Sequence, residues 1–97
     1  MSQTRIAYWF CLANMTSPNK PREKWAIGQT RSLKGAIVPC QRGYHGSPTL
    51  WQALPYAAGP IACLVELSGE LVPHGSPTDK YAARTKKLIA AVNVERE

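Results

Sequence analysis

Long apolar runs are missing from this chain of 97 residues. No stretch approaches the roughly 18 apolar residues that cross a bilayer as a helix, so we expect no membrane segment and no membrane partner. The opening residues, MSQTRIAYWFCL, also lack the long apolar core and the small-residue cleavage site of a secretory signal. These absences predict a cytoplasmic protein.

Cysteine and acidic residues are both scarce. The three cysteines, Cys11, Cys40 and Cys63, are odd in number and widely spaced, which argues against a disulfide scaffold. No Cys-x-x-Cys motif is present, so we expect no metal, no cofactor, and thiols that serve mostly as buried apolar side chains. Only 6 acidic residues oppose 12 Lys and Arg, which gives a net charge of +6. That balance favours nucleic acid, a ribonucleoprotein or an acidic protein surface as the partner.

The chain fits one domain, residues 1–97. The apolar runs at 5–12 and 61–67 predict buried strands, and 25–29 and 35–40 predict shorter ones. Residues 13–24, with two prolines and four charged side chains, predict a mobile loop.

Two helices complete the expected fold. Ser47 and Pro48 are typical of a helix start, so a short helix is expected to Tyr56, with its apolar side chains buried. Those side chains are Leu50, Trp51 and Leu54. Residues 76–79 resemble a capping box, and the apolar stripe behind them predicts an amphipathic C-terminal helix over 77–93. The predicted fold class is α+β: a small antiparallel or mixed sheet with these two helices.

The pentapeptide HGSPT occurs twice, at 45–49 and at 74–78. Each copy is interpreted as a helix start preceded by a histidine, where free backbone N–H groups favour an anion. Simple capping is the alternative interpretation. The candidate anion or ligand site consists of Tyr44, His45, Ser47, His74 and Ser76.

Positive charge is concentrated at the two ends of the chain. Residues 1–42 carry +6, residues 43–78 carry −2, and residues 79–97 carry +2. On a C-terminal helix, Lys80, Arg84 and Lys87 would share one face. We expect cations from both ends to form one partner-binding surface, and a solvated helix face is the alternative. The candidate residues are Lys80, Arg84, Lys86, Lys87, Arg22, Lys24 and Arg31.

An ordered set of short motifs runs through most of the chain: Trp25-x-x-Gly28, Cys40-x-Arg42-Gly43-Tyr44-His45, the Leu54–Ala57 helix end, CLVELSGELV at 63–72 and Asp79-Lys80. Their order resembles a small uncharacterised domain family that is common in bacteriophage and prophage genomes. The resemblance implies a phage-associated protein of the host bacterial cytoplasm and implies no activity.

A second resemblance involves the turn at 43–47 and the helix after it, which contains Ala53, Tyr56 and Ala57. This order is similar to the central part of ADP-ribosyltransferase domains, and it implies NAD as the substrate. Arg5 or Tyr8 would stand for the first motif of that family. Glu66 would be the catalytic carboxylate; otherwise it is the solvent face of a strand.

These observations favour a protein that binds without catalysis. We expect an inhibitor of a host antiviral defence complex, of the anti-CRISPR kind, that blocks nucleic-acid access. The alternatives are an ADP-ribosyltransferase-like enzyme and a nucleic-acid-binding module.

Overall fold

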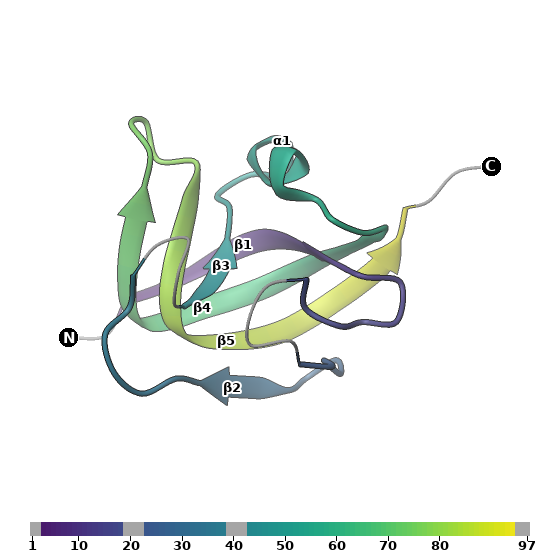
Figure 1. Cartoon of the computed structure of the whole chain (residues 1–97), viewed down its shortest axis with the longest axis horizontal. Helices are drawn as coiled ribbons and strands as arrows, with labels where there is room; N and C mark the ends of the chain where they lie inside the picture. The colour runs from purple at the N-terminus through teal and green to yellow at the C-terminus, as the bar shows by residue number, and fades with distance from the viewer. Residues whose placement is uncertain (1–2, 19–22, 39–42, 95–97) are drawn as a thin grey trace.

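The C-terminal segment predicted as a helix is the second arm of a long β-hairpin. The computed structural model describes residues 3–18, 23–38 and 43–94. β4 (Ile61–His74) pairs antiparallel with β5 (Lys80–Asn93), and β1 (Gln3–Cys11) pairs antiparallel with the other edge of β4. The three strands run side by side across the molecule (Figure 1). The described fold is therefore mostly β, and the predicted α+β class with a helix over 77–93 is wrong.

Irregular pairing explains why the strand period of β5 is hard to see in the sequence. The register between β4 and β5 shifts between Leu64 and Val65 and again between Ser68 and Leu71. At the second shift Gly69 adopts a φ of 78°, a backbone conformation that favours glycine. Each shift interrupts the alternation of inner and outer side chains, so apolar residues fall by chance at helical spacing.

The second HGSPT copy belongs to the loop of this hairpin rather than to a helix start. Gly75 has a φ of 89°, and the Asp79 N–H donates to the His74 carbonyl over 3.0 Å. A short segment containing glycine between two strands is a hairpin signal. From the sequence, the same residues were interpreted as a capping box, and this hairpin signal was missed.

Two short strands complete the sheet along the free edge of β5. β3 (Tyr44–Gly46) pairs with residues 81–83, and β2 (Thr30–Ser32) pairs with residues 85–87. Ser47, directly after β3, exchanges two backbone hydrogen bonds with Tyr8 of β1, of 2.7 and 2.8 Å. The five-stranded sheet therefore curls until its first strand meets β3 (Figure 1).

The predicted short helix is present but is oriented differently from the expectation. α1 (Leu50–Ala53) continues as a single 3₁₀ turn, η1 (Leu54–Tyr56). Thr49, not Ser47, is its N-cap, and the Thr49 hydroxyl oxygen accepts from the Gln52 N–H over 3.2 Å. Ala53 is the buried residue of this segment. The three side chains expected to be buried, Leu50, Trp51 and Leu54, are exposed.

Two segments predicted as strands between β1 and β3 differ from the prediction. In the described parts of the 13–24 loop, the Ser17 N–H donates to the Glu23 carbonyl and the Trp25 N–H donates to the Met15 carbonyl, both over 2.9 Å, and the predicted mobility of this loop stays a prediction. Neither 25–29 nor the described part of 35–40 forms a strand of the sheet. Within the curl the buried core comprises Ala7, Trp9, Cys11, Trp25, Tyr44, Ile61, Cys63, Val65, Leu67, Ala83 and Leu88.

Candidate functional site

Lys86, predicted as a partner-binding cation, lies inside the core. Its residue surface is 2% exposed, and its register partner on β4 is the fully buried Leu67. The Lys86 Nζ lies 3.1 Å from the ring centre of Trp9, 4.9 Å from that of Trp25 and 5.6 Å from that of Tyr44. Aromatic faces attract a cation because they carry negative quadrupole charge. Lys86 is therefore enclosed by an aromatic box of Trp9, Trp25 and Tyr44, and cannot reach a partner.

Arg31 and Tyr44 are tied to the edge of this aromatic box. Arg31 Nη1 donates to Glu23 Oε2 over 2.8 Å, and its guanidinium carbon lies 5.3 Å from the ring centre of Trp25. The Tyr44 hydroxyl donates to Glu23 Oε1 over 3.3 Å. Burial, together with the Glu23 carboxylate, raises the pKa of Tyr44 to about 12, so its hydroxyl keeps its proton at neutral pH. Both residues stabilise the fold from within.

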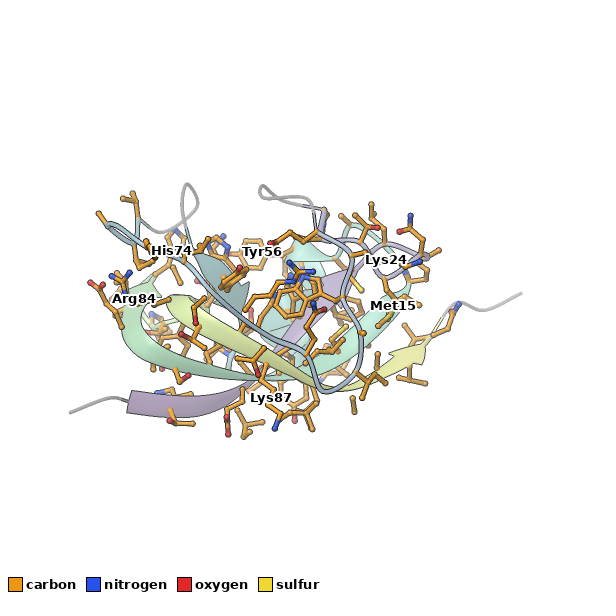
Figure 2. The ribbon with its side chains drawn as sticks, turned by 90° about the horizontal axis from the view of Figure 1, so that it is seen from below. Met15, Lys24, Tyr56, His74, Arg84 and Lys87 are labelled. Carbon is orange, nitrogen blue, oxygen red and sulfur yellow. The ribbon has the colours of Figure 1, made fainter. Side chains whose placement is uncertain are left out.

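The remaining predicted cations do not form one surface. Arg84 pairs with Glu70 over 2.7 Å and donates to the Leu33 carbonyl over 2.9 Å. Lys87 is exposed on the outer side of β5, opposite Glu66 in the register. Figure 2 shows Lys24, Arg84 and Lys87 in three separate parts of the molecule. A strand sends successive side chains to opposite faces, so β5 cannot present Lys86 and Lys87 together. Arg22 lies outside the described residues.

The outer face of β1, β4 and β5 changes from polar to apolar along the strands. The register sets the side chains in cross-strand rows. From the polar end these rows are Thr4–Ser68–Thr85, Ile6–Glu66–Lys87, Tyr8–Leu64–Ala90 and Phe10–Ala62–Val92. A groove of about 260 Å³ lies over the apolar rows, between Leu50 of α1 and the end of β5. Val92 on its floor is 60% exposed.

Exposed apolar side chains continue from this groove onto α1. Trp51 is 81% exposed, and Leu50, Leu54 and Tyr56 are also exposed. Among the described residues Trp51 is the most exposed large hydrophobic side chain. The exposure of Trp51 could not be predicted from the sequence, because an apolar helix side chain is ordinarily buried.

A second hollow, of about 120 Å³, lies between β1, β3, η1 and the start of β5. We call it the His45 pocket; its wall includes the side chains of Tyr8, Phe10, His45, Tyr56 and Lys80. Of the predicted anion site, His45 and Ser47 line this pocket. Tyr44 faces the core instead, and Ser76 is exposed in the hairpin loop.

The charge state of His45 follows from its surroundings. Burial, with the nearby positive charges of Lys80, Lys86 and His74, lowers the pKa of His45 to about 4. The imidazole is therefore neutral at pH 7, in a pocket where cations outweigh anions.

The two HGSPT copies meet beside this pocket. The Gln52 side-chain amide donates to the Thr78 carbonyl over 3.1 Å, which connects α1 to the hairpin loop. The Tyr56 hydroxyl donates to one carboxylate oxygen of Asp79, and His74 Nδ1 lies 3.2 Å from the other. These hydrogen bonds lower the pKa of Asp79. The repeat therefore contributes two adjoining walls of one hollow.

The transferase resemblance is only partly matched by one site: Tyr8, His45, Ala53 and Tyr56 line the His45 pocket, but the carboxylate that the resemblance requires does not. Tyr44 packs inside the curl, whereas Glu66 stands on the outer face between Ile6 and Lys87. The Arg5 guanidinium carbon lies 5.2 Å from the ring centre of Tyr81, and neither Arg5 nor Glu66 lines the His45 pocket.

In residues 3–18, 23–38 and 43–94 no group of three or more His, Cys, Asp and Glu residues is placed to hold a metal ion. Over the same residues no helix has the length and apolar character needed to cross a bilayer. The chain has no significant match among protein-family models, curated proteins or solved structures. The two resemblances noted in the sequence therefore stay predictions.

Proposed function

We propose that this protein acts by noncovalent docking onto another protein. The docking face consists of the apolar groove on the outer side of β4 and β5 together with the exposed side of α1. Its residues are Leu50, Trp51, Leu64, Ala90 and Val92. The observation that carries the proposal is the exposure of Trp51, 81%, on the short helix whose Leu50 lines an open apolar groove.

The chemistry of this surface favours a protein partner over nucleic acid. Contiguous apolar patches on a monomer commonly mark interaction sites, and tryptophan is enriched among the residues that dominate binding energy at interfaces. Nucleic-acid binding instead needs clustered cations, and the described cations are either buried, paired or dispersed.

Charge argues for a different protein rather than a second copy of this one. Each chain carries +6, so two copies would repel each other as they approach. The row that borders the apolar half holds Lys87 opposite Glu66, so the positive character of the molecule comes from its net charge rather than from this row. A partner with apolar side chains inside an acidic rim fits this surface. If the phage resemblance holds, that partner is the host defence complex expected from the sequence.

The proposal is tested with a photo-crosslinking amino acid inserted in living bacterial cells. p-Benzoylphenylalanine replaces Trp51 or Val92 on the docking face, and it replaces Ala36, an exposed residue of the segment after β2, as the control. We expect light-dependent adducts with a second protein at positions 51 and 92, suppressed by excess unlabelled protein, and none at position 36. Equal adducts at all three positions, or none, would contradict the proposal. An adduct of twice the chain mass would show a homodimer instead.

A pair of surface variants checks that the adducts report binding rather than misfolding. Trp51→Ser combined with Val92→Asp should abolish the adduct of the crosslinker placed at Leu64, whereas Ala36→Asp should leave it unchanged. Because all three substituted side chains are exposed, each variant should keep its free energy of unfolding within roughly 0.5 kcal/mol per substitution.

A further inference from the structure

The His45 pocket offers a second kind of site, distinct in chemistry from the docking face, although Tyr8 lines both hollows. We propose that it binds a compact oxyanion, a phosphate or carboxylate group, with the Lys80 ammonium as the main charge partner. The site would act alongside the proposed docking and does not depend on it.

The size of the pocket limits the ligand to a small group. Its volume of about 120 Å³ is less than half that of the apolar groove, which is about 260 Å³. A phosphate or carboxylate group with a few attached atoms fits such a space. Phe10 and Ala53 give part of the wall an apolar character, which suits the organic part of the ligand.

Lys80 supplies positive charge that no described carboxylate neutralises directly. Its Nζ lies 4.1 Å above the Tyr56 ring centre, and none of the described ion pairs includes it. Asp79 is the neighbouring acid, but its two carboxylate oxygens accept hydrogen bonds from Tyr56 and His74. Asp79 keeps its negative charge, but it does not line the pocket, whereas Lys80 does.

His45 adds a neutral hydrogen-bonding group to the same wall. At pH 7 its imidazole carries one N–H donor, and the burial that keeps it neutral also strengthens a hydrogen bond made there. Burial is the main cause of its lowered pKa, and the positive charge of Lys80, which lines the same pocket, adds to it and favours an anion there.

The walls of the pocket are held by bonds that exist without the ligand. Ser47 is joined to Tyr8 by two backbone hydrogen bonds, Gln52 is joined to Thr78, and Tyr56 is joined to Asp79. A site fixed in advance loses less conformational entropy on binding than one that must be assembled. Both HGSPT copies take part in this framework, which gives the repeat a role beyond helix capping.

The experiment is an NMR titration of the isotopically labelled full-length protein at constant ionic strength. Sodium phosphate and sodium acetate are added in separate arms, with sodium chloride as the reference salt. We expect saturable shifts of the His45 ring, Tyr56 and Lys80 signals with at least one of the two anions, and the arms identify which chemistry is preferred. Shifts that stay linear, or that sodium chloride reproduces, would overturn the proposal.

Matched variants assign the binding to the pocket. Lys80→Met should weaken binding at least tenfold, whereas Lys87→Met removes the same charge from the outer face and should leave it unchanged. Lys80→Arg restores the charge and should restore the saturable shifts, which separates charge loss from a folding defect. Equal affinity of the Lys80→Met and Lys87→Met proteins for the anion would show that binding depends only on the net charge of the protein, and it would overturn the assignment to the pocket. The docking proposal is unaffected by any of these outcomes.

Discussion

The Lys86 ammonium lies 3.1 Å from the ring centre of Trp9, in the interior of the curled sheet. Two further aromatic rings, those of Trp25 and Tyr44, complete its surroundings, and none of the described ion pairs includes it. Burial lowers the pKa of Lys86 well below its ordinary value. The aromatic faces offset part of this cost because they favour the charged form.

Replacing Lys86 by Met should not destabilise the protein, and it should remove a pH dependence. The folded state holds this proton less tightly than the unfolded chain, so the free energy of unfolding rises with pH toward the ordinary lysine value of 10.5. Met keeps the apolar stem and has no charge to bury, so we expect a gain of about 1 kcal/mol at pH 7. Urea unfolding at pH 7.0 and 9.5 measures both effects.

Lys87→Met is the matched control for that substitution, because Lys87 is the exposed neighbour on the same strand. The Lys87→Met protein should keep the wild-type rise in the free energy of unfolding between pH 7.0 and pH 9.5. A loss of more than about 2 kcal/mol in Lys86→Met would show that the aromatic contacts outweigh the burial of the charge. Measurements stop at pH 9.5 because the pKa of Tyr44 is raised from 10.0 to about 12 in the folded protein. Above pH 10 the unfolded chain loses this proton first, so the free energy of unfolding would fall and obscure the effect of Lys86.

His45 should make the protein sensitive to mild acid. Its pKa of about 4 in the folded state lies below the ordinary 6.5, so the unfolded chain takes up the proton first as the pH falls. Stability is therefore complete above pH 6.5 and declines between 6.5 and 4, by about 3 kcal/mol at most. Urea unfolding of the wild type and of His45→Gln at pH 7.0 and 4.5 tests this expectation.

The His45→Gln protein should lose clearly less free energy of unfolding than the wild type between pH 7.0 and pH 4.5. His74 is retained in both proteins, so the difference between them belongs to His45. Because the pKa of Asp79 is lowered from 3.8, its protonation changes the free energy of unfolding mainly below pH 3.8, which is outside the measured range. Identical losses in the two proteins would contradict the assignment.

Gly46→Ala should damage the closure of the sheet. A Cβ atom at this position would lie 2.9 Å from the Ala7 Cβ and 3.1 Å from a Leu67 methyl carbon. Contacts this short force the strands apart, and we expect a loss of about 2 kcal/mol in the free energy of unfolding. Gly28→Ala is the comparison: its Cβ meets nothing within 4 Å, and only its φ of 88° costs energy. A Gly46→Ala protein as stable as wild type would show that β3 does not approach β1 this closely.

Cys11 and Cys63 should resist thiol reagents in the folded protein. Their sulfurs lie 3.6 Å apart in the core, and the hydrogen bond between them together with burial raises the pKa of Cys63. Cys40→Ser leaves these two cysteines as the remaining thiols of the chain. In that variant a colorimetric disulfide reagent should titrate no thiol under native conditions and two after unfolding in urea. Fast native reaction of either thiol would contradict the buried arrangement.

The sequence predicted the two strands with long apolar runs and failed where a residue's neighbours decide its role. The runs at 5–12 and 61–67 were correctly assigned as strands, although the start of the first, with Ile6 51% exposed, is not buried on both faces. The 77–93 segment was assigned wrongly because good helix formers such as alanine and lysine occupy a strand. Its pairing with β4 outweighs their local preference.

The candidate site was likewise predicted in part from the sequence and in part revealed only by the structure. His45 and Ser47 were singled out from the repeat, and the structure does place them in one pocket. Lys80, taken for one cation of a helical stripe, joins them because β3 pairs beside the start of β5. The exposure of Trp51 had no signal in the sequence, since nothing in a single chain says which side of a short helix will be covered.

Composition, net charge and the unbroken apolar runs were determined by the sequence alone, because each is a property of residues or of near neighbours along the chain. Only the tertiary structure decided three other features. They are the inward direction of Lys86 and the outward direction of Lys87, the meeting of the two HGSPT copies, and the open groove beside α1. All three depend on strand register, and register is set by hydrogen bonds between segments far apart in the chain.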